Sequence, residues 1–273
     1  MRHARAGLTV LFSGILLFLA TPALAEWAVN MPVGVTPISR EVYGLHMLIF
    51  WVCVAIGAGV FGVMLWSIFH HRKSRGVKAA SFHEHHMVEV IWTVIPFLIL
   101  VSMAVPAAKT LIRMEDTRDA DLTLKVTGYQ WMWQYEYLED GVSFYSKLDS
   151  ESNKARQLNS GIDPESVPHY LLNVDNPVVL PVNKKIRILT TANDVIHAWW
   201  VPALGVKKDA IPGFINEMWT LIEEPGIYRG QCAELCGKDH AFMPIVVKAV
   251  TEEEYRQWVA EQTGKSEAET ASL

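Results

Sequence analysis

The sequence has few cysteines and few charges for its length. Only three of its 273 residues are cysteine, and the absence of a Cys-x-x-Cys-His motif excludes a covalently attached c-type haem. Charged residues make up 19% of the chain and the net charge is −5, so the basic surface typical of nucleic-acid-binding proteins is lacking. Hydrophobic residues make up 51%, which is too many for a disordered protein.

Apolar residues are concentrated in the N-terminal part of the chain. Residues 1–25 combine a basic start, a short apolar stretch and an Ala-x-Ala end, which predicts a cleaved signal peptide. A retained first membrane helix is the alternative, but the stretch is shorter than the roughly 20 residues that a span needs. Two longer apolar runs, at about 45–69 and 89–111, predict membrane-spanning helices. The loop between them is basic, so the positive-inside rule places it in the cytoplasm and the rest of the chain outside.

Charge divides the chain in the same way. Residues 114–263 hold 23 acidic and 14 basic residues, a balance of −9, which leaves +4 for the remainder. An acidic domain favours a basic protein as partner, because opposite charges accelerate encounter, and makes a nucleic acid an unsuitable one.

The outer part is rich in short apolar runs that alternate with polar residues and are separated by proline or glycine. This spacing predicts an antiparallel β-sandwich or barrel. Residues 149–167 are polar and predict an insertion loop. Thr251 and Glu254 form a capping box that predicts a final helix, and the tail at 264–273 is expected to be disordered. The expected strands lie at 122–138, 178–180, 186–191, 214–222, 227–230 and 245–250.

One short segment collects metal-binding side chains. Cys232, Cys236, His240 and Met243 lie within twelve residues, and His197 could join them from the end of a strand. A structural disulfide is the simplest alternative for two cysteines in an exported domain. The mixture of thiolate, imidazole and thioether favours copper, whereas zinc leaves the methionine unexplained. One cysteine would suit a mononuclear site, and a second allows two bridging thiolates and a dinuclear centre.

Two residues of the membrane segment carry further interpretations. Cys53 lies inside the first apolar run and is expected to be a small packing residue. Glu89 stands at the cytoplasmic end of the second run. It is either an interfacial anchor or a carboxylate of a proton pathway, because ionisable groups at membrane depth often mark ion routes.

Together with this loop, the segments Gly128–Tyr137 and Asp194–His197 resemble subunit II of haem-copper cytochrome c oxidases of the bacterial aa3 type. The resemblance covers nearly the whole mature chain. It implies a two-helix transmembrane hairpin within residues 26–113 and a periplasmic all-β cupredoxin domain, a Greek-key β-sandwich, at 114–263. It also implies a place in the bacterial inner membrane and transfer of electrons from cytochrome c to haem in subunit I, where oxygen is reduced.

The resemblance further implies a dinuclear copper centre, called CuA. Cys232 and Cys236 would bridge the two coppers, with one histidine, His197 or His240, on each. Met243 would bind one copper and the backbone carbonyl of Glu234 the other. The side chain of Glu234 would bind a magnesium ion shared with subunit I.

Other residues acquire roles by the same resemblance. Trp131 would receive the electron from cytochrome c, and Glu89 would lie at the mouth of the proton channel into subunit I. Glu136, Asp175 and Asp194 would form the docking face for a basic cytochrome c. Subunits I and III, membrane lipid and a copper-insertion factor are the other implied partners. Met132 and Phe214 depart from the family pattern, although neither is a copper ligand.

Three other classes of protein share part of this pattern. A copper-free quinol oxidase subunit II has the same architecture but lacks the ligands. A membrane-anchored copper chaperone of the Sco type carries Cys-x-x-x-Cys, but it has one anchoring helix and a thioredoxin-like fold. Nitrous oxide reductase has a similar copper loop but needs a large propeller domain, for which this chain has no room.

Overall fold

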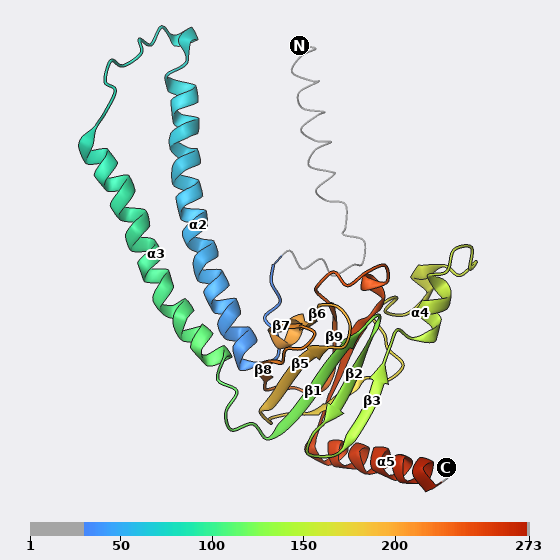
Figure 1. Ribbon diagram of the computed structural model, residues 1–273. Helices are drawn as coiled ribbons and strands as arrows, with labels where there is room; N and C mark the ends of the chain where they lie inside the picture. Colours follow the sequence, from blue (N-terminus) through green and yellow to red (C-terminus); the bar gives the residue numbers. More distant parts are fainter. Residues whose placement is uncertain (1–29, 272–273) are drawn as a thin grey trace. The chain divides into compact units, whose positions relative to one another are not determined.

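The computed structural model describes the backbone of residues 30–271 and the side chains up to Gly264 (Figure 1). The expected signal peptide, residues 1–25, lies outside the described residues.

Two long helices precede the β domain, as the sequence predicted: α2 (Pro37–His70) and α3 (His86–Met114). Both are long and apolar enough to cross a membrane. Helix α2 begins ahead of the expected residue 45 because Thr36 and Ser39 form a capping box, each side chain bonding the other's backbone N–H at 3.0 Å. The short 3₁₀ turn η1 (Lys73–Arg75) lies in the connecting loop.

Hydrogen bonds join the outer ends of the helices to the β domain. The backbone N–H of Val35 donates to the carbonyl of Ala203 at 2.9 Å. The indole of Trp219 donates to the carbonyl of Arg113, also at 2.9 Å. The segment that precedes α2 and the end of α3 are therefore both hydrogen-bonded to the β domain.

The β domain consists of two five-stranded sheets, with strand orders β3-β2-β1-β5-β8 and β4-β10-β9-β6-β7. We expected antiparallel sheets, but β1 pairs with β5 and β4 with β10 in parallel. Parallel neighbours need a crossover, and here the chain passes through the other sheet between the partners. The strands are β1 (Leu122–Tyr129), β2 (Met132–Tyr137), β3 (Val142–Ser146), β4 (Val178–Pro181), β5 (Ile186–Ala192), β6 (His197–Val201), β7 (Val206–Ala210), β8 (Asn216–Thr220), β9 (Gly226–Cys232) and β10 (Pro244–Val250).

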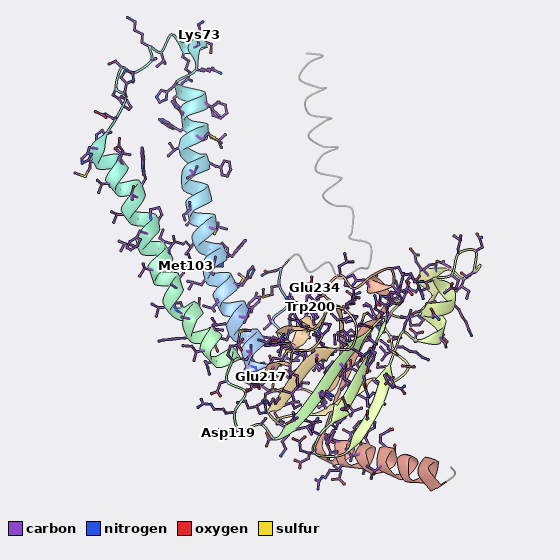
Figure 2. The ribbon with its side chains drawn as sticks, in the orientation of Figure 1. Lys73, Met103, Asp119, Trp200, Glu217 and Glu234 are labelled. Atoms are coloured by element: carbon purple, nitrogen blue, oxygen red, sulfur yellow. The ribbon has the colours of Figure 1, made fainter. Side chains whose placement is uncertain are left out.

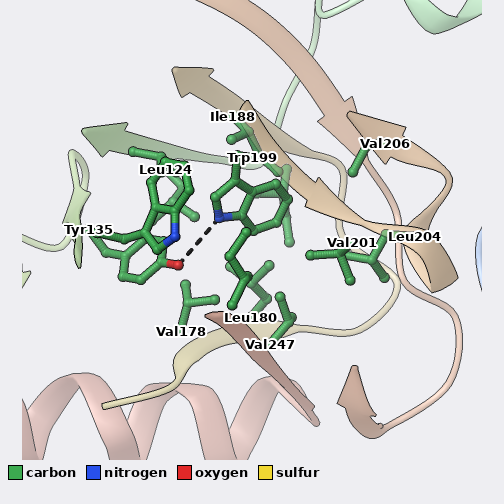
Figure 3. Close-up of a cluster of buried hydrophobic side chains, with 14 of the residues drawn as sticks. Leu124, Tyr135, Val178, Leu180, Ile188, Trp199, Val201, Leu204, Val206 and Val247 are labelled. Carbon is green, nitrogen blue, oxygen red and sulfur yellow. Dashed lines mark hydrogen bonds between the residues drawn. The ribbon is translucent and has the colours of Figure 1, made fainter. Parts of the chain in front are cut away.

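The hydrophobic core lies between the two sheets (Figure 3). Tyr135 from one sheet and Trp199 from the other are fully buried, and the indole N–H of Trp199 donates to the Tyr135 hydroxyl at 3.3 Å. Along β5 every second residue is buried, which is the pattern of a strand with one face on the core. The core fixes β6, which begins at His197, and the strands β9 and β10, which flank the metal-binding loop.

Other parts of the secondary structure also differ from expectation. The expected run 122–138 is divided by a turn into β1 and β2, and β3, β6 and β7 lie outside the expected strands. The segment 149–167 contains the short helix α4 (Ser150–Ala155), which forms because Asp149 caps it, accepting from two backbone N–H groups at 2.9 Å. Helix α5 (Glu252–Ala271) continues past Gly264, where we expected disorder, because Glu, Ala, Gln and Lys favour helix. The short 3₁₀ turns are η2 (Pro164–Ser166), η3 (Pro202–Leu204) and η4 (His240–Phe242).

Candidate metal centre

The two cysteines of the loop are buried and close together, but they are not bonded. Cys232 ends β9 and Cys236 follows in the loop, and their Sγ atoms lie 3.9 Å apart. A disulfide bond is about 2.05 Å long, so both thiols are free. Metal–sulfur bonds of about 2.3 Å, as in zinc sites, let one ion contact two sulfurs up to about 4.6 Å apart. At 3.9 Å, both sulfurs can therefore bind the same metal ion, and a second ion could bind both from the opposite side.

Each sulfur has an imidazole beside it. The Nδ1 atom of His197 lies 3.9 Å from the Sγ atom of Cys232, and that of His240 lies 3.5 Å from the Sγ atom of Cys236. The ligand atoms of His197 and the two cysteines lie within 4.8 Å of one another. The sulfur of Met243, which is 1% exposed, lies 3.5 Å from that of Cys236. The structure thus brings together the five side chains expected to bind copper.

Strand pairing explains how His197 reaches the loop. Strands β6 and β9 are antiparallel neighbours, with Trp199 opposite Cys232. The backbone N–H of Ala233 extends this pairing by donating to the carbonyl of Ala198 at 3.0 Å. His197 in β6 is therefore held against the start of the loop by the sheet itself.

The ring of His197 is held on three sides. It is fully buried, and the ring of Trp133 lies edge-on to it at 5.8 Å. Its Nε2 atom lies 2.9 Å from a carboxylate oxygen of Asp194, which leaves Nδ1 to face Cys232. A Cβ atom at Gly128 would lie 2.7 Å from the ring, so this position has no room for a side chain.

The two thiols differ in how readily they ionise. Burial opposes ionisation of Cys232, but hydrogen bonds with His197 and with the backbone of Ala198 and Glu234 bring its pKa below the ordinary value. Burial, together with the neighbouring Cys232, raises the pKa of Cys236 to about 12. A cation that binds both sulfurs must therefore displace a proton from Cys236.

The carboxylate of Asp194 is part of this electrostatic arrangement. Burial tends to raise its pKa, but hydrogen bonds from His197 and from the backbone of Val195 and Gln130 lower it below the ordinary value. Burial disfavours the charged form of His197, whereas Cys232 and Asp194 favour it and raise its pKa overall. Asp194 therefore orients the ring of His197, in addition to the docking role that the sequence suggested.

Trp131 lies in the turn between β1 and β2, directly against the loop. Its indole N–H donates to the backbone carbonyl of Cys236 at 3.3 Å, and the side-chain amide of Gln130 donates to the same oxygen at 2.8 Å. The ammonium of Lys238 lies 5.6 Å from the centre of the Trp131 ring. Trp131 is thus joined by one hydrogen bond to the backbone of Cys236.

Glu234 presents its two oxygen donors differently. Its backbone carbonyl lies 3.3 Å from the sulfur of Cys232, inside the centre. Its side chain is exposed, at the end of the β domain opposite Asp119 (Figure 2). The carbonyl thus lies where a metal on Cys232 could reach it, and the magnesium role of the side chain stays a prediction.

The remaining candidate residues lie outside the centre. Glu136 pairs with Lys125 at 2.7 Å. A carboxylate oxygen of Asp175 accepts from the backbone N–H of Lys147 at 2.9 Å. Glu89 lies in the first turn of α3, within the membrane segment. Their proposed roles in docking and proton uptake stay predictions.

Sequence reasoning missed several residues that shape the centre. Gly128 and Gln130 belong to the segment Gly128–Tyr137, but no sequence pattern indicates that Gly128 contacts His197 or that Gln130 contacts Cys236. Arg156 comes from the expected insertion loop and reaches Asp239 beside His240. A contact between residues so far apart in sequence leaves no local signal.

Comparisons with known proteins identify the family of the chain. Residues 122–250 match the family model described as the periplasmic domain of cytochrome c oxidase subunit II, and residues 23–110 match its transmembrane domain. A probable cytochrome c oxidase subunit 2 from Rickettsia bellii is 38% identical over 251 residues, which are 90% of each chain. Cytochrome c oxidase subunit 2 from Cereibacter sphaeroides is 36% identical, over 84% of this chain and 78% of the relative.

Among solved structures, the periplasmic domain of subunit II of cytochrome oxidase from Bradyrhizobium japonicum is 45% identical, with a TM-score of 0.47. It matches over 55% of this chain and 98% of its own length. The family models and the full-length relatives show that the chain belongs to the cytochrome c oxidase subunit II family and is a membrane subunit of an oxidase.

Proposed function

We propose that this subunit accepts electrons from cytochrome c at a dinuclear copper centre and passes them to haem in subunit I. Oxygen is reduced to water there, coupled to proton pumping. One observation carries the proposal: two free, buried cysteine sulfurs lie 3.9 Å apart, with an imidazole nitrogen beside each.

The residues fit copper better than the alternatives. Two thiolates, two imidazoles and a thioether form a soft to borderline donor set, and a methionine sulfur 3.5 Å from a cysteine sulfur is hard to explain for zinc. The sulfur separation allows both cysteines to bridge. A copper pair held by these residues would supply a one-electron acceptor.

The chain's own residues perform the rest. The sheet and the core hold the ligands rigidly and exclude water, since His197, Cys232, Cys236 and Met243 are all buried. Trp131 offers the route for an incoming electron, because its indole bonds the backbone of Cys236. Asp194 keeps His197 oriented with Nδ1 toward the thiolates.

The membrane segment and the partners follow from this role. We place α2 and α3 in the bacterial inner membrane, with the β domain in the periplasm. Glu89 then lies on the cytoplasmic side, at the mouth of a proton channel, and Glu234 shares a magnesium ion with subunit I. Since both thiols must be reduced before copper binds, a copper-insertion factor is needed in addition to subunits I and III.

The Sco-type chaperone is disfavoured by the fold. Such a protein has one anchoring helix and a thioredoxin-like domain, whereas residues 30–271 of this chain form two long apolar helices and a ten-stranded sandwich. A copper-free quinol oxidase subunit would lack the ligand set that the structure assembles.

The electron-accepting role predicts a strong dependence on salt. In the purified oxidase, the second-order rate of oxidation of a basic cytochrome c should fall about tenfold between roughly 0.02 and 0.2 M ionic strength, because screening weakens steering by an acidic domain. Glu136→Gln should slow the reaction at low salt, whereas Glu253→Gln, on α5, should leave it unchanged. A rate independent of salt would contradict an acidic docking face, and no reaction with any cytochrome c would contradict the proposed function.

A further inference from the structure

Arg156 joins a short helix outside the copper site to the turn that carries His240. Its guanidinium donates to both carboxylate oxygens of Asp239, at 3.2 and 3.5 Å. Its Cζ atom lies 4.3 Å from the centre of the Phe242 ring. Since Asp239 precedes His240 and Phe242 precedes Met243, one side chain contacts both ends of the turn η4.

The Arg156 contact is stronger than an ordinary surface ion pair. The side chains of Arg156 and Asp239 are only 22% and 25% exposed, and the guanidinium both engages the carboxylate in two places and stacks over an aromatic ring. Arg156 is also held in place: its Nε–H donates to Asn153 at 2.7 Å and its backbone N–H to Ser152 at 3.0 Å. Ser152 and Ala155 are buried, so α4 is packed against the domain on one side.

His240 depends on its backbone for position more than His197 does. Among the described residues, the ring of His240 has one hydrogen-bonding contact, with the sulfur of Cys236 at 3.5 Å. The ring of His197 is also held by Asp194 and packed in the core. The turn η4 therefore determines the position of His240, and Arg156 holds that turn.

We propose that Arg156 is a positioning residue of the copper centre. By clamping Asp239 and Phe242, it fixes the backbone that presents His240 and Met243 to Cys236. This inference rests on the proposed function, because the turn matters to electron transfer only if these side chains bind copper.

The first test needs no copper. Hydrogen exchange of the full chain in detergent, followed by mass spectrometry, should show the peptide 237–243 exchanging about tenfold faster in Arg156→Gln than in the wild type, because a partly buried charged hydrogen bond is lost. Lys154→Gln removes the same charge from an exposed position of α4 and should change nothing. Equal exchange in both variants would overturn the proposal.

The second test uses the copper-loaded chain. Arg156→Gln and Asp239→Asn should each lose copper to a chelator about tenfold faster, at the lower end of what loss of a supporting contact costs in metal affinity. The double variant should lose it no faster than either single variant, since both remove one contact. The two single variants should also alter the copper hyperfine pattern. Arg156→Lys keeps the charge but not the paired hydrogen bonds, so its rate of copper loss should lie between those of the wild type and Arg156→Gln.

Different failures have different meanings. If Arg156→Gln and Asp239→Asn change copper loss in opposite directions, the effect is that of charge alone and the positioning role is wrong. If the wild type binds a copper pair and Arg156→Gln retains it as well as Lys154→Gln does, the positioning role is also wrong. If the wild type binds no copper pair, the proposed function fails, and the exchange measurement still decides whether Arg156 holds the turn.

Discussion

Replacing Cys232 with serine should abolish the paired-copper centre. A thiolate bridges two ions because it is soft and ionises readily, and hydrogen bonds already lower the pKa of Cys232. A serine hydroxyl keeps its proton at neutral pH and is a poor copper ligand, so the variant is expected to bind at most one copper per chain. Electron paramagnetic resonance of the copper-loaded full chain should show no sharing of the unpaired electron.

Cys53→Ser is the matched control for this experiment. Cys53 lies exposed on α2, in the membrane segment. The substitution therefore makes the same chemical change far from the centre. It should leave copper content and spectrum unchanged. A shared-electron signal that survives in Cys232→Ser would refute the bridging role of this cysteine.

A methyl group at Gly128 should damage the same centre without replacing any of the proposed ligands. The new Cβ atom would lie 2.7 and 2.9 Å from two ring atoms of His197, closer than real side chains approach. The ring cannot retreat, because it is fully buried, packs against Trp133 and is held by Asp194. Gly128→Ala should therefore cost about 1–3 kcal/mol in the free energy of unfolding, as overpacking does.

Copper affinity in Gly128→Ala should fall on the order of 100-fold, since a displaced histidine costs at least as much as a lost supporting contact. Chelator competition on the full chain measures this affinity, and denaturation of the copper-free chain measures stability. Gly264→Ala introduces the same methyl group where nothing lies within 4 Å, and it should behave as wild type. Unchanged copper affinity in Gly128→Ala would mean that His197 is not a ligand.

The fold was predictable where local sequence decides it. Length and hydropathy identified both membrane helices, and alternation identified most strands of the sandwich. The early start of α2 was also encoded locally, in the capping box of Thr36 and Ser39. The parallel pairing of β1 with β5 was not, because strand order depends on how distant segments pack and not on the pattern within either strand.

The candidate site was likewise predictable where its residues are close in sequence and not where they come from distant elements. Four of the proposed ligands lie in one short loop, so their residue types and spacing predict a metal centre directly. The sequence offered His197 as a further imidazole at the end of a strand, and the pairing of β6 with β9 is the physical reason that it reaches the loop. Arg156 and Gly128 act on the centre from other elements, by a side chain that crosses to the loop and by a missing side chain. Neither effect has a signature in sequence alone.

Metal counting combined with electron paramagnetic resonance on the copper-loaded full chain tests the central claim most directly. The account predicts two coppers per chain and, in the oxidised state, one unpaired electron shared equally between them. One copper per chain with an unshared electron, or preferential binding of zinc, would contradict a dinuclear electron-transfer centre at Cys232 and Cys236.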